Sequence, residues 1–175
     1  TPAADIRGSL RFTKNDSVFG DCWKADVFVR LKAPKKDNPI ECSASFLTGK
    51  TGNTAGAYNY WFAKMGVAGF NVPLTPAPVI WDGVEGFVYS HMKKLSPTLV
   101  QPDNTNKFGL GCKFYFYDQG TSGKTYVFDL GAEAQFEQGG FSVELLGSAS
   151  AFNFTKIGTK YKGPGFITGN GSIGY

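Results

Sequence analysis

Apolar and polar residues alternate strictly near the N-terminus of the chain. Between Ile6 and Thr13 the even positions are apolar or glycine and the odd positions are polar. Between Trp23 and Lys32 the odd positions are apolar and the even positions are mostly charged. A period of two is typical of a β-strand that packs one face on a core and turns the other to water. We therefore predict two half-buried strands here.

The last third of the chain repeats this pattern in shorter pieces. A further strand begins at Cys42, and alternating or apolar segments with turn residues between them cover the ranges 110–117, 126–130, 132–136, 141–145 and 167–175. About nine or ten short strands at this spacing predict an all-β fold with little helix. We expect an immunoglobulin-like or jelly-roll β-sandwich. Without an internal repeat or a linker, residues 1–175 are expected to form a single domain.

The middle of the chain has a weaker pattern. Residues 49–60 are rich in Gly, Asn and Thr, which predicts a long loop. The segment 61–70 fits either a bulged strand or a short helix. Residues 79–89 predict a hairpin that turns at Asp82-Gly83 or at Glu85-Gly86. Residues 90–98 are expected to hold one helical turn before Pro97.

Composition supports a β protein of an extracellular kind. The chain has 23 glycines, 15% aromatic residues and only 18% charged residues. The net charge of +4 comes without an Arg-rich arm, so no nucleic-acid partner is expected. The small, polar start of the chain is typical of a mature N-terminus after processing, which favours a secreted or cell-surface location.

No membrane span is expected from the sequence. The chain contains no apolar run of 18 residues, the length that a transmembrane helix needs. A sheet that crosses a membrane needs apolar bands of about 9–11 residues on every strand. The Pro-rich middle, with Pro73, Pro76 and Pro78, does not supply them.

Three cysteines allow one disulfide with a spare thiol, or three buried free thiols. Cys22 and Cys42 bracket the second strand region, so a disulfide between them would join the N-terminal strands. We expect one disulfide, because the remaining features are extracellular in kind, with Cys22 and Cys42 as the candidate pair.

Several catalytic patterns fail on inspection. The segment GTSGKT at 120–125 resembles a phosphate-binding loop, but a strand and not a helix follows it. His91 is the only histidine, and it lies beside two lysines without a nucleophile motif. The dispersed cysteines do not form a zinc site. We therefore expect no enzyme activity and no cofactor or metal.

An all-β glycoside hydrolase is the remaining catalytic alternative. Such enzymes need two carboxyl groups about 5–9 Å apart. The candidate pairs are Asp82 with Glu85 and Glu133 with Glu144. Alternation places Glu133 and Glu144 on the wet face of their strands, so we expect them to be solvated and not catalytic.

Aromatic residues and short amides gather around the predicted central loop. Sugars bind to flat aromatic faces supplemented by amide and carboxylate hydrogen bonds. If the domain recognises a glycan, the expected site comprises Tyr58, Asn59, Tyr60, Trp61, Trp81 and Asp82. Burial of Trp61 and Trp81 in the core is the competing interpretation.

Both ends of the chain resemble subunits of bacterial chaperone–usher fimbriae. The opening ADIRGSLRF…WKADVFV is similar to the first strands of those subunits, and GFITGNGSIGY is similar to their closing strand. The resemblance implies an incomplete immunoglobulin-like sandwich, completed by a strand from another subunit. It also implies a surface fibre, cell adhesion and a host glycan as a further partner. Residues 1–13 are then the candidate donor strand, through Ile6, Leu10 and Phe12.

A viral structural protein is the other alternative. A jelly-roll fibre head or coat predicts the same strands and Gly-rich loops. The lack of an Arg-rich arm favours a fibre head over a coat. On either alternative the chain is a structural or binding protein.

Overall fold

The computed structural model describes residues 4–32, 39–51, 56–96, 99–120, 125–151, 155–157, 160–162 and 165–174. Within these ranges the regular structure is strand alone, which confirms the all-β prediction. Part of the expected loop (52–55) and part of the rejected phosphate loop (121–124) lie outside the described residues. The strands are β1 (Ala4–Asp16), β2 (Gly20–Leu31), β3 (Ile40–Lys50), β4 (Asn59–Pro73), β5 (Val79–Ser90), β6 (Met92–Ser96), β7 (Leu99–Pro102), β8 (Asn106–Asp118), β9 (Tyr126–Glu137), β10 (Gly140–Ala151), β11 (Thr155–Ile157), β12 (Lys160–Lys162) and β13 (Gly165–Gly174).

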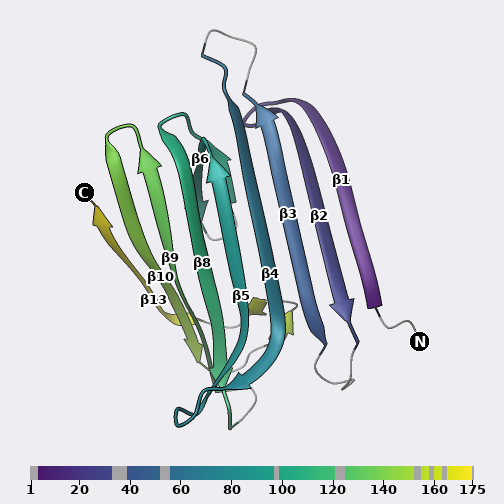
Figure 1. The fold of residues 1–175 in the computed structure, drawn as a ribbon, viewed down its shortest axis with the longest axis vertical. Helices are drawn as coiled ribbons and strands as arrows, with labels where there is room; N and C mark the ends of the chain where they lie inside the picture. The colour runs from purple at the N-terminus through teal and green to yellow at the C-terminus, as the bar shows by residue number, and fades with distance from the viewer. Residues whose placement is uncertain are drawn as a thin grey trace.

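One antiparallel sheet dominates the fold (Figure 1). Its nine strands lie in the order β1-β2-β3-β4-β5-β8-β9-β10-β13, and neighbours in this order are hydrogen-bonded to each other. The hairpins β6-β7 and β11-β12 form separate two-stranded sheets. Within the described residues, β1 and β13 are the edges of the main sheet.

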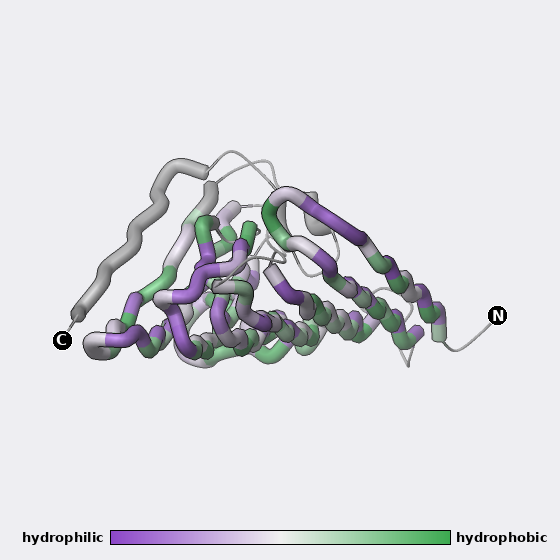
Figure 2. Tube along the Cα trace, turned by 90° about the horizontal axis from the view of Figure 1, so that it is seen from above, coloured by the Kyte–Doolittle hydropathy of each residue, from purple (hydrophilic) through white to green (hydrophobic). Residues whose placement is uncertain are grey.

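The main sheet is strongly curved and forms a trough (Figure 2). We call its concave side the inner face and its convex side the outer face. The β6-β7 hairpin covers the inner face, where Met92 packs with Phe87 and Tyr89. This second layer over a curved sheet is consistent with a β-sandwich.

The core lies on the inner face beneath that hairpin. It comprises Cys22, Tyr60, Phe87, Tyr89 and Met92, all with less than a tenth of their surface exposed. The Tyr60 hydroxyl donates a hydrogen bond of 2.6 Å to the carbonyl oxygen of Phe19. That bond satisfies the one polar group of a fully buried ring and holds the β1–β2 turn against β4.

Two predictions for the middle of the chain are wrong. Residues 79–89 do not form a hairpin but one continuous strand, because Gly83 and Gly86 both pair in register with β4 and β8. The turn lies instead at residues 74–78, where two prolines interrupt the ladder. Residues 92–96 form strand β6 and not a helical turn; His91, with a φ of 51°, makes the bend between β5 and β6.

Candidate functional site

The outer face of the sheet carries an unbroken apolar surface. Residues that pair directly share a face, so the registers define rows that cross the sheet from β1 to β10. The middle row is Gly8, Val27, Ala44, Met65, Gly86, Cys112, Ala132 and Leu145. The rows on either side of it are Leu10, Ala25, Phe46, Ala63, Val88, Leu110, Ala134 and Val143, and Ile6, Val29, Cys42, Val67, Val84, Phe114, Leu130 and Gly147. These rows contain no charged residue.

This apolar surface is open to solvent. Ile6 and Leu10 are each 70% exposed and Met65 is 68% exposed. We expected these alternating apolar residues to pack in the core, and that expectation is wrong for the outer face. A contiguous apolar surface of this extent is unusual for a protein surrounded by water and marks a contact surface.

Aromatic side chains border the apolar rows at both ends of the strands. At one end lie Phe12, Trp23, Trp61, Phe108, Phe136 and Phe141. At the other end Trp81 pairs with Phe116, whose ring stacks on that of Phe128 at 4.9 Å. On β9 the two borders are marked by Phe128 and Phe136. They are eight positions apart in the sequence, which corresponds to about 26 Å at ~3.3 Å per residue.

The inner face has the opposite character, because it carries charged residues, and those near its centre are largely buried and paired. Lys64 lies 2.7 Å from Glu85, and Lys113 lies 2.9 Å from Asp129. Glu85 is only 7% exposed. Burying a charge is costly unless it is paired and hydrogen-bonded, so these cross-strand pairs are what allow a charged interior.

Glu133 is the most deeply buried of these charges, at 1% exposure. It accepts hydrogen bonds from the Tyr89 hydroxyl at 2.5 Å and from the Lys94 ammonium at 3.3 Å. Burial lowers the pKa of Lys94, against the opposing effect of Glu133. Lys94 belongs to β6, so this cluster attaches the hairpin to the sheet.

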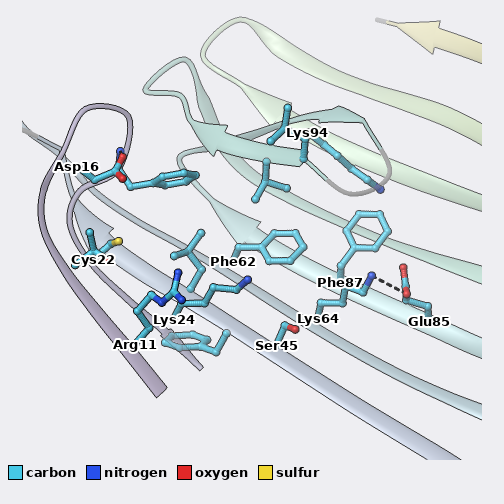
Figure 3. Close-up of a pocket in the computed structure, with 16 residues that line it drawn as sticks. Arg11, Asp16, Cys22, Lys24, Ser45, Phe62, Lys64, Glu85, Phe87 and Lys94 are labelled. Atoms are coloured by element: carbon cyan, nitrogen blue, oxygen red, sulfur yellow. Dashed lines mark hydrogen bonds and ion pairs between the residues drawn. The ribbon is translucent and has the colours of Figure 1, made fainter. Parts of the chain in front are cut away.

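A cavity of about 380 Å³ lies on the inner face between the β1–β2 end of the trough and the β6-β7 hairpin. Its apolar wall includes Phe62 and Phe87. Four cationic side chains line it, from β1, β2, β4 and β6 (Figure 3): Arg11, Lys24, Lys64 and Lys94. A cavity of this volume with an apolar wall and a few charged groups has the usual form of a small-molecule site.

The structure distributes the residues of the predicted glycan site over both faces of the sheet. Tyr60 is fully buried on the inner face, whereas Trp61, next in the strand, points to the outer face. Asn59 is exposed at the start of β4, and the half-buried Tyr58 ring lies 5.8 Å from that of His91. Consecutive strand residues point to opposite faces, so these four residues do not form one platform.

Trp81 and Asp82 lie at the opposite end of the sheet from those residues. Trp81 pairs with Val72 and Phe116, while Trp61 pairs with Ser90 at the far end of β5. The two ends of this distance, positions 81 and 90 of β5, are nine positions apart, which corresponds to about 30 Å at ~3.3 Å per residue. Asp82 is buried, at 1% exposure, beside a register shift. The structure therefore does not bring Trp81 and Asp82 to the predicted loop.

The predicted disulfide between Cys22 and Cys42 is wrong, since all three cysteines are free. Cys22 pairs with Gly49 and is buried on the inner face, whereas Cys42 pairs with Val29 on the outer face. Side chains on opposite faces of a sheet cannot meet the geometry that a disulfide requires. Cys112, like Cys42, lies in the outer rows.

Three of the four candidate catalytic carboxylates, Asp82, Glu85 and Glu133, are buried. Glu133 and Glu144 are direct partners across β9 and β10, but Glu133 is not on a wet face as we expected; Tyr89 and Lys94 bind it instead. Glu85 is bound by Lys64. Among the described residues no group of three His, Cys, Asp or Glu side chains is placed to hold a metal ion.

The positions of the charges along the strands are the sequence signal for this arrangement, in which the apolar face is exposed and the charged face is covered. On each main-sheet strand from β1 to β10, one face is free of charge between the aromatic borders and the other carries at least one charged residue. Alternation alone does not say which face is covered. Opposite charges at paired positions, such as Glu85 and Lys113, allow the charged face to be the covered one. No helix in the described part of the chain is both long and apolar enough to span a membrane. Comparisons with protein-family models, with curated proteins and with solved structures find no match.

Proposed function

We propose that this chain is a non-catalytic membrane protein whose sheet stands in a lipid bilayer, with the outer face against hydrocarbon. The observation that carries this proposal is the charge-free outer surface from β1 to β10, combined with paired charges on the inner face. Water-soluble proteins arrange these two classes of residue the other way round.

The dimensions of the outer face support a bilayer as its partner. Strands that cross a membrane are tilted and have about 9–11 residues within it, bordered by aromatic residues at both interfaces. Phe128 and Phe136 enclose nine residues of β9, both included, which fits that length. Trp61 and Trp81 lie at opposite borders, where an indole ring favours the interface between lipid and water.

The prolines that argued against a membrane span in the sequence lie outside the apolar rows. Pro76 and Pro78 lie in the β4–β5 turn, and Pro73 is the last residue of β4. They therefore leave the apolar rows uninterrupted. Alternating strands also lack long apolar runs, which is compatible with export before insertion.

The edges of the sheet indicate how the protein assembles. Lipid offers no hydrogen bonds, so a sheet in a bilayer must have both edges paired. Nine antiparallel strands in sequential order make β1 and β13 run in the same direction. We propose that the edge strands β1 and β13 pair either with each other or with a strand of another subunit. The second possibility agrees with the expectation from the sequence that the chain assembles with other subunits by strand addition.

A fimbrial subunit in water is the second candidate, favoured by the open β1 edge with Ile6, Leu10 and Phe12 exposed. It predicts that a peptide of residues 1–13 from one molecule stabilises another. The two candidates separate in one experiment: the lipid-embedded protein needs vesicles for its stability, whereas the fibre subunit needs only the peptide.

The decisive test uses two neighbouring residues of β1. Leu10 is on the outer face and Ser9, also exposed, is on the inner face near Asp26. Leu10→Arg should reduce co-flotation with phosphatidylcholine vesicles and cost about 2–4 kcal/mol if the site is near the bilayer midplane, or less nearer the interface. Ser9→Arg should float as the unchanged protein does. Equal behaviour of both variants, or failure of the unchanged chain to float, contradicts the proposal.

A further inference from the structure

The inner-face cavity contains two kinds of cationic residue. Lys64 is bound to Glu85 at 2.7 Å, and Lys94 is bound to Glu133 at 3.3 Å with its ammonium 3.7 Å from the centre of the Phe87 ring. These two lysines are neutralised within the fold. Their charges maintain the structure of the cavity wall and the attachment of β6.

Arg11 and Lys24 are different. They are direct partners across β1 and β2, so two positive charges face each other on the inner side of the sheet. Like charges at directly opposed positions destabilise a strand pair. No ion pair to Arg11 is found in the described part of the chain, and the contact between Lys24 and Asp26 is long, at 3.7 Å between exposed side chains.

Neither acidic residue of the cavity wall forms an ion pair with them within the described part of the chain, and Glu85 is paired with Lys64. The Asp16 carboxylate accepts hydrogen bonds from the backbone N–H groups of Val18 and Phe19, each at 2.9 Å. It is thereby committed to the β1–β2 turn. Figure 3 shows Arg11 and Lys24 at one end of the cavity, with Phe62 between them and Phe87.

We propose that this cavity binds an amphipathic anion, with its acidic head at Arg11 and Lys24 and its apolar body against Phe62 and Phe87. The head is a phosphate monoester, sulfate or carboxylate, for which a guanidinium beside an ammonium supplies charge-assisted hydrogen bonds. The body is an aromatic ring or a short alkyl chain, which a volume of about 380 Å³ accommodates. The site lies on the inner face and does not depend on what covers the outer face.

The test is a titration of the full chain with 1-naphthyl phosphate, in phosphatidylcholine vesicles or, should the chain not insert, in buffer. 1-Naphthol measures the binding of the apolar body alone, and inorganic phosphate measures the binding of the acidic head alone. We expect saturable binding of 1-naphthyl phosphate that is at least tenfold tighter than that of either part. Arg11→Gln and Lys24→Gln should each weaken it about tenfold, as loss of a hydrogen bond to a charged group does.

Arg7→Gln is the matched control, because Arg7 lies on the same strand and face but is bound to Asp5 at 2.8 Å and is not part of the cavity wall. It should leave the affinity unchanged. Phe62→Leu should weaken naphthyl phosphate and leave inorganic phosphate unaffected. Equal affinities for all variants, or equal binding of 1-naphthol, overturn the proposal.

Competition identifies the source of the natural anion. Displacement of naphthyl phosphate by vesicles that contain phosphatidic acid assigns the site to a lipid headgroup, and displacement only by soluble phosphate monoesters assigns it to a metabolite. Both results uphold the amphipathic anion, whereas displacement by inorganic phosphate at equal concentration overturns it.

Discussion

The ring of Tyr89 lies over Gly109 on the neighbouring strand, in the space that a side chain at position 109 would occupy. Phe87 lies in the same way over Gly111, and the two rings are parallel within 7°. Aromatic residues of β5 thus fill positions that glycines of β8 leave open. This is why a Gly-rich strand can lie in the centre of the sheet.

We predict that Gly109→Ala destabilises the protein by about 1–3 kcal/mol, because an added methyl group forces the Tyr89 ring out of its position. Gly86→Ala is the control, since a Cβ there meets only the carbonyl oxygen of Gly111 at 3.9 Å. Denaturant unfolding measures both. Equal effects of the two substitutions would show that the fit between Tyr89 and Gly109 has no special role.

The sequence predicted the strands far better than it predicted their environment. Alternation identified β1, β2, β8 and β10 because one side of each strand is uniformly apolar. It could not show that this side faces outward, since a period of two is the same whichever face is covered. Glu133 illustrates the error: its place in the alternation is as expected, but a hairpin covers that side.

The order of the strands in the sheet could not be predicted from the sequence either. Immunoglobulin-like and jelly-roll sandwiches connect strands by Greek-key crossovers, whereas the strands described here follow one another across the main sheet. The candidate cavity depends on this order, because it places Arg11 and Lys24 beside each other and within reach of β4 and β6. The predicted glycan site does not assemble because residues 79–90 form one continuous strand, and Trp61 and Trp81 lie at opposite ends of it.

We predict that Glu133→Ala destabilises the fold by about 3–5 kcal/mol, because it leaves the Lys94 ammonium buried without a carboxylate. Thermal or denaturant unfolding gives the magnitude. The double variant Glu133→Ala with Lys94→Met should recover part of the loss, since it removes the unpaired charge as well. A double variant less stable than Glu133→Ala would show that Lys94 is not held by Glu133.

In vesicles, the native tryptophans and a tryptophan placed at position 65 should lie at different depths in the bilayer. Trp61 and Trp81 lie at the aromatic borders and Met65 lies in the middle row. Bromines near the lipid headgroups should quench the native tryptophans most. In a background where every native tryptophan is replaced by phenylalanine, Met65→Trp should respond most to bromines near the acyl chain ends. Equal quenching of all positions would exclude the proposed orientation.

The thiols provide a check that needs no substitution. With all three cysteines free, a reducing agent should leave the melting temperature unchanged, and denatured protein should take up three alkyl groups. In vesicles, a hydrophilic maleimide should fail to modify Cys42 and Cys112, because both lie in the outer rows. Modification at the rate seen without lipid would place these rows in water.

The sequential strand order has a consequence for how the chain reaches its final state. Apart from β5 and β8, which flank the β6-β7 hairpin, each described pair from β1 to β10 joins strands that are adjacent along the chain. Loop closures of that kind are short and their entropic cost is small. The sheet can therefore grow by one strand at a time from any hairpin, and removal of an edge strand exposes a new edge without disturbing the pairs that remain.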